Sequence, residues 1–326
     1  MWDFRIGRTI GLVLRTWPFV LFRIVVYAGI TLAYVVATGA GAGIGYGSGH
    51  VFGGGDGPFA FALWGGIIGF GLVSGILYWI REYILYLVKA GHVAALVALI
   101  DGRPVPAGFG QIGFAHRIVA GRFVEASVLF AMDQLVKGVI RAVAVLTGGV
   151  AAFIPLPGLS SLVGALNAVM RMSLTYVDEI ILGHIIRQDS AAPFDTARRG
   201  VILYAQNGGR MVKNAVWLTV FMWVLGIAVF VLTLAPAAAI LYAMPGQPAG
   251  WAFVFSIVFA WAFISAVVEP FLIAALMQVY FAAIEGQTPD PIWDRRLSEA
   301  SGEFRKLKER AVETFGGPRW GNTETS

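Results

Sequence analysis

The amino-acid sequence predicts an all-α, polytopic membrane protein with about six transmembrane helices arranged in three hairpins. Its composition, the length of its apolar runs and its distribution of positive charge all lead to this prediction. Of the 326 residues, 58% are hydrophobic and 13% are charged, whereas soluble domains have about half and about a quarter. Because a hydrocarbon core about 30 Å thick is crossed by about 20 helical residues, apolar runs of that length predict spans.

Six apolar runs are long enough to cross a bilayer. They lie near residues 18–36, 59–80, 136–156, 159–181, 215–234 and 250–268. Glycine and proline, which break helices, are concentrated between the two runs of each successive pair, at 53–58, 155–158 and 245–248. The runs therefore predict three hairpins in a membrane domain of residues 1–286, followed by a tail of residues 287–326. A further glycine run at 39–47 is expected to be a flexible loop.

Positive charge is distributed unevenly among the segments that join these runs. The three segments expected on the outer side, 39–58, 155–158 and 245–249, contain no lysine or arginine. Because cytoplasmic segments are enriched in these residues, both termini are expected in the cytoplasm and the protein in the bacterial inner membrane. The formal net charge of +5 is then explained by anionic lipid headgroups, and no nucleic-acid partner is expected.

Several apolar segments continue past the expected inner membrane surface, at 83–100, 123–135 and 271–284. They are expected either to lie in the interface or to pack together as a cytoplasmic helical layer. Two related segments, 87–104 and 271–288, indicate an internal duplication. Residues 293–315 mix Arg, Lys and Glu with apolar residues, which predicts a solvated or membrane-surface helix.

The ionisable residues of the spans lie near the inner headgroup layer. Lys137, Asp178, Glu179 and Glu269 fall there when residues are counted down from the outer turns, and Arg171 lies about one turn deeper in the membrane. They are candidate binding residues for a substrate or coupling ion. The favoured interpretation, however, is that they form interfacial ion pairs that set helix rotation. In either case, Lys137 is expected to approach Asp178 across the hairpin.

Tryptophan residues within the spans give a second candidate site. Trp223 and Trp261 could bind a quaternary ammonium group through cation–π attraction. The alternative, which is favoured, is that they are interfacial anchors or core residues.

Small residues in the second run predict close helix packing. Gly65 and Gly69, and Gly71 and Gly75, are each four residues apart, as in membrane helices whose backbones approach closely. The partner is either another span or a second subunit of a homo-oligomer.

Motifs for catalysis and metal binding are absent from the sequence. Cysteine is absent, the four histidines are dispersed, and no nucleophile-elbow, zinc-protease or Walker motif is present. An enzyme is therefore the least favoured class, and no metal or other cofactor is expected.

Two stretches carry a resemblance to known proteins. Residues 123–213, with DTARRG at 195–200 and NGGR at 207–210, and residues 274–286 resemble an uncharacterised group of prokaryotic six-span membrane proteins. They are also distantly similar to the choline-transporter-like family. The long cytoplasmic loop and terminal domain of its eukaryotic members are not evident, and no binding residue is carried over.

Two functions follow from these observations. The resemblance implies a transporter of a small organic cation, a lipid or another weakly polar solute. The apolar extensions and the basic tail instead favour a non-catalytic membrane scaffold or assembly factor that binds a protein partner.

Overall fold

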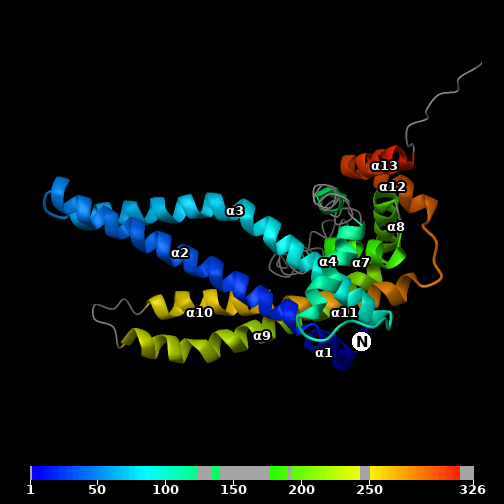
Figure 1. Cartoon of the computed structure of the whole chain (residues 1–326), viewed down its shortest axis with the longest axis horizontal. Coiled ribbons are helices and arrows are strands. Elements are labelled where there is room, and N and C mark those ends of the chain that lie inside the picture. The colour runs from blue at the N-terminus through cyan, green and yellow to red at the C-terminus, as the bar shows by residue number, and fades with distance from the viewer. Residues whose placement is uncertain (1, 123–133, 140–175, 190–191, 243–249, 316–326) are drawn as a thin grey trace, which may run out of the picture. The chain divides into compact units, whose positions relative to one another are not determined.

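The computed structural model describes residues 2–122, 134–139, 176–189, 192–242 and 250–315 (Figure 1). These residues are helical apart from the turns and short connections between helices, and they include no strand. The chain divides into two compact units. One is Pro18–Lys89, and the other combines Met1–Trp17 with Ala90–Ser326.

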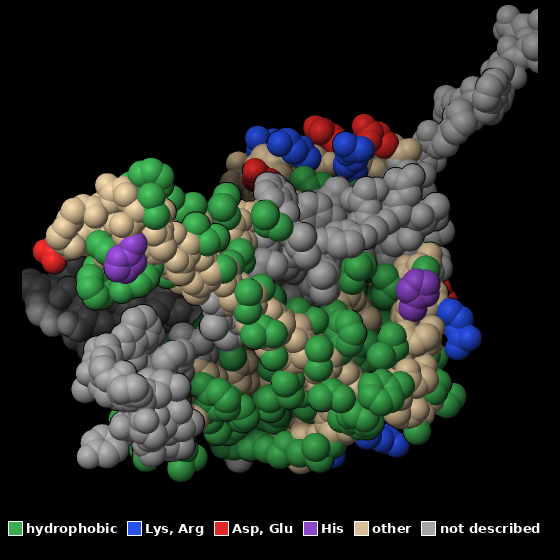
Figure 2. Space-filling model, turned by 60° about the vertical axis from the view of Figure 1, so that its left-hand side comes forward, with side chains coloured by type: hydrophobic (Ala, Val, Ile, Leu, Met, Phe, Trp, Pro, Cys, Tyr) green, Lys and Arg blue, Asp and Glu red, His purple; other side chains and the backbone are tan. Residues whose placement is uncertain are grey.

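Four helices are long and apolar enough to cross a membrane within the described part of the chain: Trp17–Phe52, Gly57–Ile76, Gly208–Ala235 and Phe259–Ile284. Hydrophobic side chains cover much of the face drawn in Figure 2, with charged side chains at its margins. The prediction of an all-helical membrane protein is confirmed at this level. The expected spans at 136–156 and 159–181 fall largely outside the described residues.

The first unit is a hairpin of two long helices, α2 (Trp17–Phe52) and the greater part of α3 (Gly57–Ile100) (Figure 1). The turn between them is at residues 53–56, where glycine breakers predicted it. The expected loop at 39–47 is wrong, because these residues belong to α2.

Close contact with α3 explains why this glycine run is helical. A Cβ atom on Gly41 would collide with the backbone of Gly65, and one on Gly45 would collide with the backbone of Phe61. Gly65 and Gly69 are equally close to α2, which confirms the predicted packing and makes its partner a helix of the same chain. By contrast, a Cβ on Gly71 or Gly75 would meet nothing within 4 Å.

The second unit contains another pair of long helices. α9 (Gly208–Tyr242) packs against α10 (Gly250–Phe263), which continues through a π-helical turn, η1 (Ile264–Val268), into α11 (Glu269–Ile284). Pro270 lies in the first turn of α11, where a missing backbone N–H is tolerated.

The C-terminal ends of α3 and α11 form a packed layer with shorter helices. α7 (Val177–Gln188) packs on α8 (Pro193–Gln206), and both contact α11. A Cβ on Gly183 of α7 would lie 3.4 Å from Val97 of α3 and 2.8 Å from Met277 of α11. Of the two placements expected for the apolar extensions, the structure therefore shows mutual packing for the ends of α3 and α11. The extension at 123–135 lies largely outside the described residues.

The C-terminal tail folds onto this layer. Its helices α12 (Pro291–Ala300) and α13 (Gly302–Phe315) pack on α8, and Leu297, Phe304 and Leu307 are fully buried. The expectation of a solvated or membrane-surface helix is wrong for this face, because the apolar residues of the tail are spaced to form an internal contact. Two further helices, α1 (Ile6–Arg15) and α4 (Gly110–Arg122), complete the unit.

Candidate functional site

A pocket of about 400 Å³ lies between α9 and the continuous helix formed by α10, η1 and α11. This volume is within the range of small-molecule sites, about 300 to 1,000 Å³. Trp223 and Trp261, which were predicted together, line this pocket with Glu269, which was predicted as part of the charged layer. The remaining lining residues are Tyr176, Met222, Gly226, Ile227, Ile264 and Ser265.

One wall of the pocket comes from a single face of α9. Trp223, Gly226 and Ile227 are three and four residues apart, so they project from the same side of the helix. Gly226 gives room to the Ile264 side chain, because a Cβ there would lie 2.7 Å from the Cδ1 atom of Ile264. The glycine thus lets η1 approach α9 beside Trp223.

The opposite wall depends on the π-helical turn. Trp261 and Glu269 are eight residues apart, which in a straight α-helix would separate them by about 80° around the axis. A π-helical turn inserts one additional residue, so the spacing acts like one of seven and both residues share a face. The π turn therefore brings the carboxylate below the indole.

Among the described residues, the pocket lining is mostly apolar and includes one carboxylate. Trp223 and Trp261 are 55% and 48% exposed, whereas Glu269 is only 8% exposed. Ser265 and Tyr176 add hydroxyl groups. Indole faces attract cations, and a carboxylate in an apolar site attracts them more strongly. The arrangement suits a small organic cation.

A much smaller cavity adjoins this pocket. It has a volume of about 10 Å³ and shares Tyr176 and Met222 with the pocket, while Leu272 and Leu276 belong to its own wall. Tyr176 and Met222 thus stand between the pocket and the inner part of α11.

The other predicted site residues lie elsewhere. Lys137 Nζ is 3.6 Å from Asp178 Oδ2, which confirms the ion pair expected from the hairpin. Glu179 projects from α7 about 100° away from Asp178. It is buried and does not line the pocket. Arg171 lies outside the described residues. Of the charged residues predicted for the site and described by the structure, only Glu269 therefore lines the pocket.

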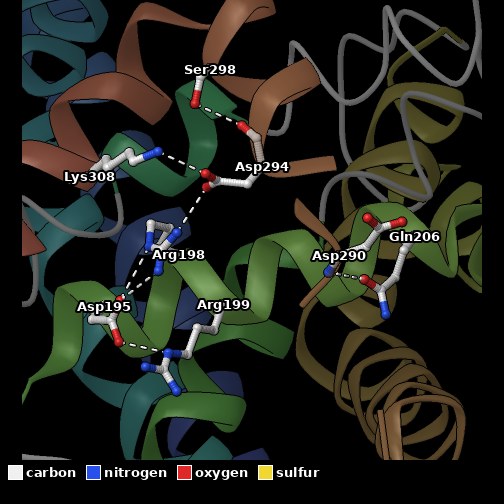
Figure 3. A network of polar contacts seen from close by, with 8 residues as sticks. All are labelled: Asp195, Arg198, Arg199, Gln206, Asp290, Asp294, Ser298 and Lys308. Carbon is white, nitrogen blue, oxygen red and sulfur yellow. Dashed lines mark hydrogen bonds and ion pairs between the residues drawn. The ribbon is translucent and has the colours of Figure 1, made fainter. Parts of the chain in front are cut away.

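A polar network that was not predicted joins the tail to α8 (Figure 3). Arg198 donates to Asp195 and to Asp294, at 3.0 and 2.9 Å, and Lys308 donates to Asp294 at 2.8 Å. Burial acts to raise the pKa of Asp294, but hydrogen bonds from Lys308 and Arg198 leave it below its usual value. Asp195 and Arg198 belong to the DTARRG stretch, so part of this stretch holds the tail in place.

The lining residues that were not predicted differ in the signal that the sequence contains for them. Gly226 and Ile227 could have been found from their helical spacing to Trp223, and Ser265 from its position between Trp261 and Glu269. Tyr176 comes from a distant segment, so only the tertiary fold brings it to the pocket.

No protein-family model, curated protein or solved structure matches this chain. The resemblance carried by 195–200 and 207–210 remains a prediction.

Proposed function

We propose that the protein is a six-span transporter of the bacterial inner membrane that carries a small organic cation through the pocket formed by Trp223, Trp261 and Glu269. The observation that supports this proposal most is that these three residues, each selected for its chemistry, line one cavity. A lipid headgroup with the same cationic chemistry is included in the proposed substrate class.

The expected orientation places this pocket in the inner half of the membrane, with both termini in the cytoplasm. Arg210 and Lys213 precede the apolar part of α9, and Trp223 follows Lys213 by ten residues, or about 15 Å of helix. A cation at that depth would be costly without a counter-charge. Glu269 provides the counter-charge, and the indole faces provide attraction that does not require water.

A scaffold function loses support from one of the two features that favoured it, the apolar extensions. Leu96 and Phe281, which would have been exposed for a partner, are buried within the chain. A partner could reach them only if the helical layer opened. The transport proposal requires no such opening of the layer.

Uptake into proteoliposomes tests the proposal. Radiolabelled choline and tetramethylammonium should accumulate. Trp223→Leu or Trp261→Leu should raise the half-saturation concentration by about 2- to 30-fold, which corresponds to the loss of one cation–π contact. Trp217→Leu is the matched control, because Trp217 is 44% exposed on the same helix but does not line the pocket. Equal losses in all three variants, or no uptake of any organic cation by well-folded protein, would contradict the proposal.

A further inference from the structure

A stripe of apolar side chains lies exposed along the N-terminal helix. Ile6, Ile10 and Leu14 follow one another at four-residue intervals and therefore project from the same side of α1. Trp17 and Phe109 extend this stripe, with their ring centroids 5.2 Å apart. The result is a continuous apolar surface on α1 and the start of α4.

The opposite side of α1 is anchored, so the stripe cannot simply turn inward. Gln278 of α11 donates to the Thr9 hydroxyl at 2.9 Å, and the Phe4 ring packs edge-on against Phe271. Before the helix, Asp3 accepts hydrogen bonds from Lys213 and Asn214 of α9 at 3.0 and 2.8 Å. These contacts hold the stripe outward.

The chain itself indicates what covers the stripe. α1 ends at Arg15, and the first candidate span begins at Trp17, so only Thr16 separates them. Because no linker intervenes, the Leu14 end of the stripe must lie close to the membrane surface, and the rest of α1 extends from there over about 15 Å. Lipid is therefore the neighbour that covalent geometry provides.

Charge on the rest of α1 favours an anionic surface. Arg8 and Arg15 are seven residues apart and share a side of the helix away from the stripe, and Arg5 directly precedes it. All three are exposed, although Arg8 also donates to the Ile100 carbonyl at 3.0 Å. No acidic residue occurs between positions 4 and 55.

We infer that α1 and the start of α4 lie in the plane of the membrane–water interface and bind anionic lipid headgroups. Ile6, Ile10 and Leu14 enter the boundary between headgroups and acyl chains, while Arg5, Arg8 and Arg15 contact lipid phosphates by extending from the polar side. This surface is separate from the tryptophan pocket and does not depend on what that pocket binds.

Site-directed fluorescence tests this inference, and a chain without cysteine suits it. Leu14→Cys and, separately, Val312→Cys would be labelled with an environment-sensitive dye in the full-length protein, reconstituted into phosphatidylcholine vesicles containing phosphatidylglycerol. These positions are matched, with 66% and 68% exposure. We expect nitroxide-labelled lipids to quench the probe at Leu14, whereas acrylamide, which stays in water, should not. At Val312 we expect acrylamide to quench the probe and the lipids not to. Ile10→Cys gives an independent second probe of the stripe.

The headgroup preference is tested with the same probe. Nitroxide-labelled phosphatidylglycerol should quench it more than nitroxide-labelled phosphatidylcholine, by up to about fivefold per arginine. In the Arg5→Gln, Arg15→Gln variant this difference should shrink. Acrylamide access equal to that of Val312 would show that the stripe is in water, and protection without lipid quenching would show that protein covers it. Either result would overturn the inference, as would equal quenching by both lipids.

Discussion

Trp223, Trp261 and Glu269 make different contributions to the pocket. The two indoles offer broad, weakly attractive faces, each contributing about 0.5 to 2 kcal/mol toward a cation. Glu269 determines the sign of the charge that is favoured. These roles could be assigned from residue type, but their convergence could not, because it depends on a π turn and on the close approach at Gly226.

The Lys137–Asp178 pair could be predicted from counting alone. A tight hairpin brings residues equally distant from its turn to the same level, which requires no knowledge of side-chain contacts. The burial of Glu179, one residue later, depends on which face of α7 meets its neighbours. Because α7 is buried on nearly every side, its sequence contains no clear indication of that face.

His184 gives a prediction at the same scale. Burial, with a smaller effect from Arg187, lowers its pKa from 6.5 to about 4. The neutral ring is therefore favoured in the folded protein, and stability is fully present above pH 6.5. As the pH falls toward 4, the unfolded chain takes up a proton that the folded protein does not, and stability decreases by roughly 3 kcal/mol.

Thermal unfolding in detergent between pH 7 and pH 4 measures this decrease. His184→Gln should flatten the dependence of the unfolding temperature on pH, while the same change at His116, which is exposed on α4, should leave it intact. An unchanged pH dependence in His184→Gln would show that another group is responsible.

At the scale of elements, the register that the π turn sets should be essential for the pocket. Inserting one alanine after Val267, which lies in η1 but does not line the pocket, should rotate Glu269 by about 100° relative to Trp261. We expect cation affinity to fall as far as in Glu269→Gln, with unchanged helical circular dichroism. Val267→Ala is the control and should bind normally. Normal binding by the insertion variant would rule out this role for the register.

Helix propensity explains which elements could be predicted. The turn at 53–56 was identified correctly, because Gly54 and Gly55 have no tertiary contact that would favour a helix. The same reasoning failed at 39–47, where glycines at intervals of four form a backbone surface that packs on α3. The prediction of a solvated or membrane-surface helix in the tail was wrong for a similar reason. The burial of Leu297 and Phe304 depends on α8, which is about a hundred residues away in the sequence.

At the scale of the whole molecule, the membrane class could be predicted because it follows from composition and run length. The arrangement of the inner helical layer could not, because several of its helices are apolar on every side and periodicity does not distinguish their contacts. The proposed orientation rests on the asymmetric distribution of lysine and arginine. The pocket lies where that orientation places the inner half of the membrane.

Equilibrium binding to the purified protein tests the central claim most directly. Choline and its neutral carbon isostere, 3,3-dimethyl-1-butanol, have nearly the same shape and differ in charge. The account predicts that choline binds, that the isostere does not compete at comparable concentration, and that Glu269→Gln removes the preference. Equal competition by the isostere, or undiminished choline binding in Glu269→Gln, would contradict a pocket that recognises cations through Trp223, Trp261 and Glu269.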